Sequence, residues 1–152
     1  MYDCAWVQAR SGRVKELVLG FLFSEDRPAD GIKVLLIEKK NPAWQAGKLN
    51  GVGGKVEENE LPLEAMVREF HEEVGIHTFP SDWNLRLTLE GPDWRVFCYR
   101  SYGYPHLAIQ REAERPVIAD ALDLPRHVFP NLRWIVPLLL DTNPGIAKVE
   151  YE

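Results

Sequence analysis

The 152-residue chain is poor in cysteine and has no long apolar run. Its two cysteines, Cys4 and Cys98, form no spacing typical of a metal knuckle, so we expect both to be free thiols. No apolar stretch approaches the roughly 20 residues that cross a bilayer, which predicts no membrane partner. The first residues also lack the basic, apolar and cleavage regions of a secretory signal, and the sequence therefore favours a cytoplasmic protein.

Basic residues are outnumbered, since 18 Lys and Arg face 23 Asp and Glu and give a formal net charge of −5. General nucleic-acid binders normally carry a basic face, so we expect no stable nucleic-acid partner. A nucleotide substrate stays open, because divalent cations can lie between a polyphosphate and acidic side chains. No repeat or low-complexity linker divides the chain, and its length predicts a single domain over residues 1–152, as a monomer or a homodimer.

Acidic residues gather on one predicted helix within the segment GKVEENELPLEAMVREFHEEVGI, residues 54–76. At about 100° per residue, Glu69, Glu72 and Glu73 fall along one edge of that helix. An apolar stripe lies beside this edge, formed by Leu63, Met66, Val67, Phe70 and Val74. Carboxylates this close repel one another unless a cation lies among them, and Mg²⁺ prefers oxygen ligands. The edge is a candidate metal site, although glutamates on a helix are more often solvated surface.

The spacing of this segment decides between the two interpretations. It fits G-x5-E-x7-R-E-U-x-E-E-x-G-U, where U is a bulky apolar residue, with every fixed position filled by Gly54, Glu60, Arg68, Glu69, Phe70, Glu72, Glu73, Gly75 and Ile76. This is the signature of the Nudix hydrolases, and the chain closely resembles that family. The resemblance implies hydrolysis of a nucleoside diphosphate linked to another group, with Mg²⁺ or Mn²⁺ as cofactor. It also implies an α/β fold, the Nudix α/β/α sandwich with a mixed central β-sheet and helices on both faces.

The pattern of apolar residues favours a compatible architecture. Strands are expected over residues 14–24 and 32–38 as a hairpin, over 83–90 and 94–102 as a second pair, and more weakly over 117–121. The acidic helix is expected to begin near Pro62 and to end at Gly75. A second helix is expected over 131–141, with Trp134 and Leu138 facing inward and with Leu132 and Ile135 as further candidates for that face. Strands before and after a helix favour a mixed sheet between helical layers.

The resemblance implies that the metal is bound by the carboxylates of Glu69, Glu72 and Glu73 and by the backbone carbonyl of Gly54. Glu60 has more than one interpretation. It could stabilise the dipole of the helix that follows it, or, as the resemblance implies, give structural support or contact the metal.

Further residues could act on the substrate. Arg68 lies four residues before Glu72 and is close enough to orient that carboxylate. The resemblance places Lys55 near substrate phosphate, and an ordinary surface lysine is the alternative. It also implies a general base, either a glutamate of the acidic helix or an acid from a later loop. Within QREAERP, Glu112 and Glu114 are candidates for that acid, although either could be loop surface.

The segment KKNPAWQAGKLNGVGGKVEENE resembles the MutT branch of the family, the oxidised-purine nucleoside triphosphatases, and FPNLRWIVPLLL is similar to its animal member. The resemblance implies contacts to a substrate phosphate from Lys39, to the purine edge from Asn50, and to the base pocket from Trp44, Phe129 and Asn131. The expected reaction is hydrolysis of a (deoxy)nucleoside triphosphate to the monophosphate and pyrophosphate. That member has an aspartate pair where this chain has Asn131 and Leu132, so a preference for oxidised bases such as 8-oxo-dGTP stays open.

Two other functions compete with this hypothesis. One is hydrolysis of ADP-ribose or another nucleoside diphosphate derivative, and Pro92 lies one residue beyond the place where that subgroup often has a proline. The other is a non-catalytic nucleotide-sensing domain that keeps the fold. Such domains usually lose glutamates of the signature, and this chain retains all of them.

Overall fold

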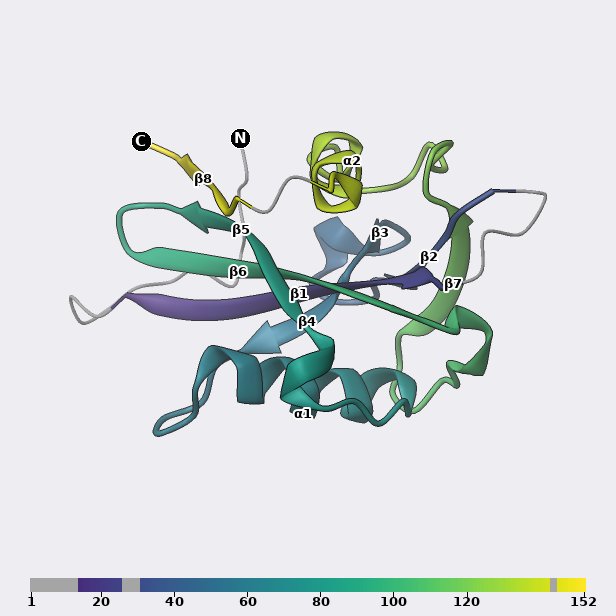
Figure 1. Cartoon of the computed structure of the whole chain (residues 1–152), viewed down its shortest axis with the longest axis horizontal. Helices are drawn as coiled ribbons and strands as arrows, with labels where there is room; N and C mark the ends of the chain where they lie inside the picture. Colours follow the sequence, from purple (N-terminus) through teal and green to yellow (C-terminus); the bar gives the residue numbers. More distant parts are fainter. Residues whose placement is uncertain (1–13, 26–30, 143–144) are drawn as a thin grey trace.

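The computed structural model describes residues 14–25, 31–142 and 145–152, and the prediction for Cys4 lies outside them. An eight-stranded sheet has the order β3-β2-β1-β6-β5-β8, with β4 pairing to β1 and β7 to β2. The helices α1 and α2 cover opposite faces of this sheet (Figure 1), so the predicted α/β/α sandwich is confirmed. The strands are β1 (Lys15–Ser24), β2 (Lys33–Glu38), β3 (Leu49–Asn50), β4 (Val52–Lys55), β5 (Asn84–Glu90), β6 (Trp94–Gly103), β7 (Arg115–Asp120) and β8 (Ala147–Glu150). The helices are α1 (Pro62–Val74), α2 (Leu132–Leu140) and the short 3₁₀ segments η1 (Ala43–Gln45), η2 (Pro80–Asp82) and η3 (Pro105–Leu107).

Strand β1 organises the sheet. It pairs in parallel with β6 along its whole length. Its other edge is divided, because the stretch from Leu17 to Gly20 pairs with β4 and Phe23 pairs with Val34 of β2. The predicted hairpin of β1 and β2 is thus confirmed near its turn, while the earlier part of β1 holds β4. This division places the glycines of β4 beside α1, which contacts both β4 and β1.

The acidic helix α1 has the predicted limits and the predicted buried stripe. Pro62 occupies the first helical position, and the backbone N–H of Leu61 donates to the Glu64 carboxylate at 2.9 Å. Gly75 ends the helix with φ of 73°, a left-handed conformation that glycine adopts without strain. Met66 and Phe70 are fully buried in the core on this side of the sheet. The edge of α1 beside this stripe is left for the carboxylates.

Helix α2 also lies where it was predicted, but the prediction for its inner face is partly wrong. Leu132, Ile135 and Leu139 are fully buried, whereas Trp134 is 39% exposed. The buried residues recur at i, i+3 and i+7 and define one stripe, and Trp134 lies roughly 200° around the helix from Leu132. Leu138, as predicted, packs against the core. The prediction that Trp134 faces inward followed from its apolar side chain and is wrong. The helical period of the buried residues places it on the exposed face.

The last strand, β8, was not predicted. Residues Ala147–Glu150 pair in parallel with β5 at the edge of the sheet. Their side chains alternate between half-buried and exposed, which is the period of a strand covered on one face. Four residues give too short a pattern to distinguish a strand from a loop in the sequence alone.

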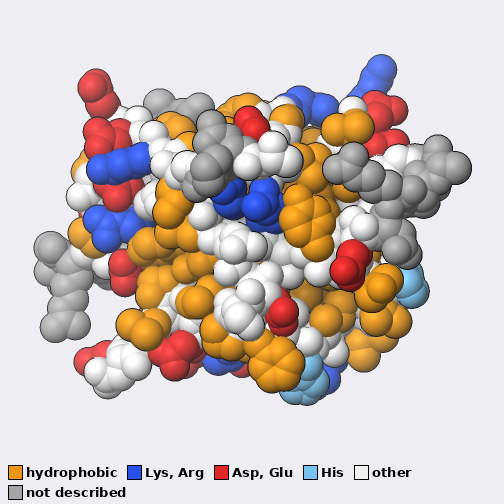
Figure 2. Space-filling model, in the orientation of Figure 1, with side chains coloured by type: hydrophobic (Ala, Val, Ile, Leu, Met, Phe, Trp, Pro, Cys, Tyr) orange, Lys and Arg blue, Asp and Glu red, His pale blue; other side chains and the backbone are white. Residues whose placement is uncertain are grey.

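Within the described residues, no helix is both long enough and apolar enough to span a membrane. On the face drawn in Figure 2, acidic, basic and apolar side chains are interspersed. Charges of both signs therefore share this face.

Candidate active site

Strand β4 and helix α1 meet at Gly54. A Cβ atom added at this position would overlap the carboxylate of Glu69. A Cβ at the neighbouring Gly53 would run into the backbone of Val18 in β1. Only glycine therefore lets the β4 backbone, with its carbonyl groups, lie directly against the acidic edge of α1.

Arg68 holds the acidic edge together. Its guanidinium forms a fork with Glu60, in which Nε donates to Oε2 at 2.7 Å and Nη2 donates to Oε1 at 2.9 Å. Nη1 donates to Glu69 Oε1 at 2.9 Å and to Glu72 Oε2 at 3.2 Å, and Nη2 also donates to the carbonyl of Lys55 at 3.0 Å. One arginine thus ties α1 to β4 and to the segment before the helix. The predicted contact between Arg68 and Glu72 is confirmed.

This network sets the charge state of its members. The hydrogen bond from Arg68 lowers the pKa of Glu60, and the same bond raises the pKa of Arg68 well above its usual range. Both carboxylate oxygens of Glu60 accept hydrogen bonds from Arg68. Of the interpretations of Glu60, this contact favours structural support of the acidic edge. The acidic residue of the first helical turn is Glu64, so Glu64 is the residue best placed to stabilise the helix dipole.

Glu73 lies deeper than the other two helix carboxylates of the site. Burial is the main cause that raises its pKa to about 8, and the negative charge of Glu69 adds to the effect. Burial also raises the pKa of Glu69, although Arg68 acts in the opposite direction. Among the described residues, the buried Oε2 atom of Glu73 has no hydrogen-bond partner. A buried carboxylate without a partner is costly, and a bound cation would remove that cost.

The loop before β7 faces this edge. Glu114 accepts a hydrogen bond from Lys39 Nζ at 3.0 Å and another from the backbone N–H of Lys40 at 2.9 Å. The charges of Glu112 and Glu114 both raise the pKa of Glu73, so the loop carboxylates lie close enough to act on the helix. Glu112 also raises the pKa of Glu69, and its side chain is exposed. The two loop acids therefore differ, because Glu114 anchors the loop to the residues just after β2 while Glu112 is exposed.

The oxygen-rich edge suits a hard cation, but the described side chains are not already arranged around one. No group of three His, Cys, Asp or Glu side chains in residues 14–25, 31–142 and 145–152 forms a ready metal site. Arg68 provides the physical reason, since its Nη1 atom lies between the carboxylates of Glu69 and Glu72. The unpartnered Glu73 oxygen and the close approach of Gly54 to Glu69 both fit an oxygen-coordinated divalent ion.

A second group of predicted residues meets where η1 lies against the segment before α2. The backbone of Leu49 joins the two segments, because its N–H donates to His127 and its carbonyl accepts from Phe129. The ring of Trp44 meets Phe129 edge-on, with centroids 6.2 Å apart and planes at 88°. Lys48 Nζ lies 6.0 Å and 5.7 Å from the centroids of these two rings. The structure thus brings together an aromatic pair and a cation.

Three amide side chains come from the segments that carry or follow this aromatic pair. Asn50, which is 2% exposed, accepts a hydrogen bond from the Gly51 N–H at 2.8 Å. Asn131 caps α2, and both polar atoms of its side chain are buried without a partner among the described residues. Gln45 is fully buried, and neither Nε2 nor Oε1 of its amide has a hydrogen-bond partner among the residues that the structure describes. Gln45 and Lys48 were not predicted as site residues, because a polar residue in a loop is ordinarily at the surface and nothing in the spacing marks Gln45 as buried or Lys48 as half-buried.

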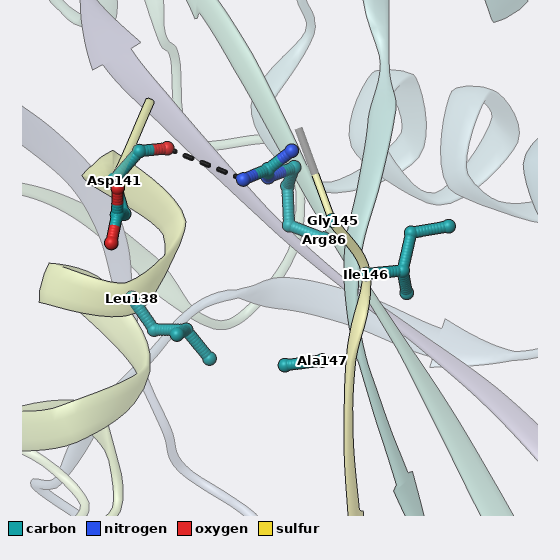
Figure 3. A pocket seen from close by; sticks show the side chains of 6 residues that line it. All are labelled: Arg86, Leu138, Asp141, Gly145, Ile146 and Ala147. Atoms are coloured by element: carbon teal, nitrogen blue, oxygen red, sulfur yellow. Dashed lines mark hydrogen bonds between the residues drawn. The ribbon is translucent and has the colours of Figure 1, made fainter. Parts of the chain in front are cut away.

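A separate pocket of about 230 Å³ lies between β5, β8 and the end of α2 (Figure 3). Arg86 occupies a β-bulge of β5, which directs its side chain toward α2, and its Nη2 atom donates to the Asp141 carbonyl at 3.3 Å. Arg100 Nη1 donates to the carbonyls of Leu139 and Asp141 at 2.8 Å and 3.0 Å. The two arginines therefore satisfy the carbonyl groups at the C-terminal end of the helix, and this pocket is structural.

The family model described as the NUDIX domain matches residues 16–135, most of the chain. The chain belongs to the Nudix family. Members of the family hydrolyse pyrophosphate bonds, and in this Nudix domain Gly54 of β4 lies directly against Glu69 of α1. No curated protein matches the chain in sequence.

Solved Nudix structures share the fold of this Nudix domain. A MutT/nudix family protein from Enterococcus faecalis is 18% identical with a TM-score of 0.69, and the match covers 85% of this chain and 62% of that protein. MutT from Aliivibrio salmonicida and Vibrio cholerae is represented by a structure 22% identical, with a TM-score of 0.67 and coverage of 84% and 98%. A MutT NUDIX hydrolase from Burkholderia pseudomallei is 23% identical, with a TM-score of 0.66 and coverage of 84% and 98%. Similarity at this level of identity establishes the shared fold.

Proposed function

We propose that this Nudix domain is a Mg²⁺-dependent pyrophosphohydrolase that converts a (deoxy)nucleoside triphosphate to the monophosphate and pyrophosphate, and that Mn²⁺ can replace Mg²⁺. The observation that carries the proposal is the short connection between the acidic edge and the aromatic and amide cluster. Asn50 of that cluster is four residues before Gly54, a reach of at most roughly 13 Å. A nucleotide could therefore place its base against the cluster and its phosphates against the acidic edge. The MutT names of the structural neighbours support this choice.

At the metal end, the carboxylates of Glu69, Glu72 and Glu73 and the Gly54 carbonyl would hold the ion. When bound, Mg²⁺ neutralises phosphate oxygens and lowers the pKa of a bound water. Arg68 positions Glu69 and Glu72 from one side, and Glu60 fixes Arg68 in turn. We assign Glu60 a positioning role on the basis of this fork.

The remaining charged residues handle the proton and the phosphates. Glu112 is exposed and its charge acts on Glu69 and Glu73 of the acidic edge, so we assign it as the base that accepts a proton from the attacking water. Glu114 positions that loop through its bonds to Lys39 and Lys40. Lys39 and the exposed Lys55 contribute positive charge for the polyphosphate.

At the base end, Trp44 and Phe129 offer aromatic surface, and Asn50 and Asn131 offer amide donors and acceptors. Leu132, the first residue of α2, is fully buried in the core and its side chain has no polar atom. Asn131 alone therefore serves the position where the MutT-branch relative carries an aspartate pair. The preference for an oxidised purine does not follow from this arrangement, and unmodified purine nucleotides are substrates on equal terms in this proposal.

A panel of nucleotides with Mg²⁺ tests the proposal. It should contain the common and the 8-oxo purine triphosphates, ADP-ribose and a nucleotide sugar, with release of pyrophosphate scored separately from release of orthophosphate. We expect pyrophosphate and a nucleoside monophosphate from at least one triphosphate, with no turnover in excess chelator. Preferential cleavage of ADP-ribose, or release of orthophosphate alone, would overturn the assigned reaction.

A further inference from the structure

The amide of Gln45 is buried in an arrangement that folding alone does not explain. The side chain has 0% exposure, and neither Nε2 nor Oε1 has a hydrogen-bond partner among the described residues. Buried polar groups are nearly always paired, because an unpaired donor or acceptor loses its bonds to water without replacement. An amide with two unpaired atoms therefore calls for a ligand or another specific role.

The location of Gln45 indicates which ligand. It follows Trp44 directly in η1, and Trp44 contacts the ring of Phe129. The second amide with two unpaired atoms, Asn131, is two residues beyond Phe129. Each unpaired amide is thus one or two residues away in sequence from one ring of this aromatic pair. A planar ring that carries adjacent hydrogen-bond donors and acceptors would use the rings and the amides together.

We propose that Gln45 is a specificity-determining residue that reads the edge of the nucleotide base together with Asn131. This inference rests on the proposed nucleotide hydrolysis. The two amides are neutral, and each carries one donor group and one acceptor, so they complement a base edge on which donors and acceptors alternate. Because Gln45 is covered in the structure, the base has to displace side chains on entry, and the 45% exposed Trp44 is the neighbour best placed to move.

The test replaces Gln45 by Met, which keeps the length of the side chain and removes both polar groups. The matched control is Asn84→Leu, which removes an exposed amide at the start of β5. Melting temperatures are measured for the metal-free proteins alone and with AMP, GMP, CMP and UMP at equal concentration. A separate series uses inorganic triphosphate with Mg²⁺ as a probe of the phosphate end.

We expect Gln45→Met to melt about 2–4 °C higher than the unmodified protein when no nucleotide is present, since the variant no longer buries an unpaired amide. The shift given by the preferred monophosphate should largely disappear, while the shift given by inorganic triphosphate with Mg²⁺ stays. In the hydrolysis assay, the ratio of kcat/KM between the best and the worst base should fall about tenfold. Asn84→Leu should change neither the nucleotide shifts nor the base preference.

A lower melting temperature for Gln45→Met combined with an unchanged base preference would overturn the inference, because it would make Gln45 a structural amide. Absence of any monophosphate shift in the unmodified protein would overturn it as well. A different result would show that the proposed function is wrong, namely that the unmodified protein cleaves no triphosphate. In that case, loss of the monophosphate shift in Gln45→Met would still support base reading by Gln45.

Discussion

The acidic edge of α1 and the amide cluster around Trp44 and Phe129 are organised in opposite ways. At the acidic edge, one guanidinium donates to three carboxylates and a carbonyl, so most side-chain positions are fixed before substrate arrives. In the amide cluster, Gln45 and Asn131 are buried without partners among the described residues, and Trp44 remains 45% exposed. The first region is held together by its own hydrogen bonds, whereas the second contains buried polar groups that the described residues leave unpaired. The following predictions separate the two regions.

The largest effect is expected from Glu73→Gln. The carboxylate is buried beside Glu69, and a neutral amide there removes one charge from the proposed set of metal ligands. Turnover with Mg²⁺ should fall roughly 10²- to 10³-fold, the loss typical of a group that stabilises transition-state charge. Relative kcat/KM values for different bases should stay the same, because the amide cluster is untouched. Retention of most turnover would remove Glu73 from the metal-binding set.

Arg68→Gln should act on stability as well as on activity. The substitution removes the fork to Glu60 and both contacts to the α1 carboxylates, so the free energy of unfolding should fall by about 2–3 kcal/mol. Arg95→Gln is the matched control, since Arg95 pairs with Glu90 on the surface and its loss should cost only a few tenths of a kcal/mol. Urea unfolding of both variants without metal provides the comparison. If both variants lost the same free energy of unfolding, the Arg68 network would contribute no more to stability than a surface ion pair.

The free energy of unfolding should depend on pH through the titration of Glu73. Its pKa is about 8 in the folded chain and near 4.5 when unfolded, so the folded chain holds the proton between these values and the unfolded chain does not. The stability contributed by the protonated group is complete below about pH 4.5 and is lost as the pH rises to about 8, by up to about 1.4 kcal/mol per pH unit.

The difference between the metal-free protein and its Glu73→Gln variant isolates this contribution, because other titrating groups are common to both. The slope between pH 5 and 8 should be steeper in the unmodified protein, measured by urea unfolding at several pH values. Glu58→Gln, at an exposed position before α1, is the control and should leave the slope unchanged. Parallel curves for the protein and the Glu73 variant would contradict the raised pKa.

The smallest effect is expected from Asn50→Ala. The buried amide ends β3, between η1 and β4 in the sequence, so in our proposal its loss should change recognition of the base more than the chemistry. The ratio of kcat/KM for purine and pyrimidine triphosphates should shift about tenfold, the value of one neutral hydrogen bond. An equal loss for both classes of base would assign Asn50 to the general structure of the loop.

The difference between the regions also explains what the sequence could predict. The limits of α1, its buried stripe and the contact between Arg68 and Glu72 follow from helical period and fixed spacing, and the structure confirms them. The unpaired state of Gln45 does not follow from spacing, because it depends on which segments pack together across a long sequence separation. Trp134 and β8 show the same limit on a smaller scale. A single apolar side chain and a four-residue strand carry too little periodic information to fix their environment.

Calorimetric titration of Mg²⁺ into the metal-free protein near pH 7, in two buffers of different ionisation enthalpy, tests the central assignment most directly. We predict saturable binding accompanied by release of on the order of one proton, since the ion takes the place of the proton on Glu73. Binding and proton release should both be lost in Glu73→Gln. Absence of saturable binding, or identical titrations for the protein and the variant, would contradict the assignment of the acidic edge as a metal site.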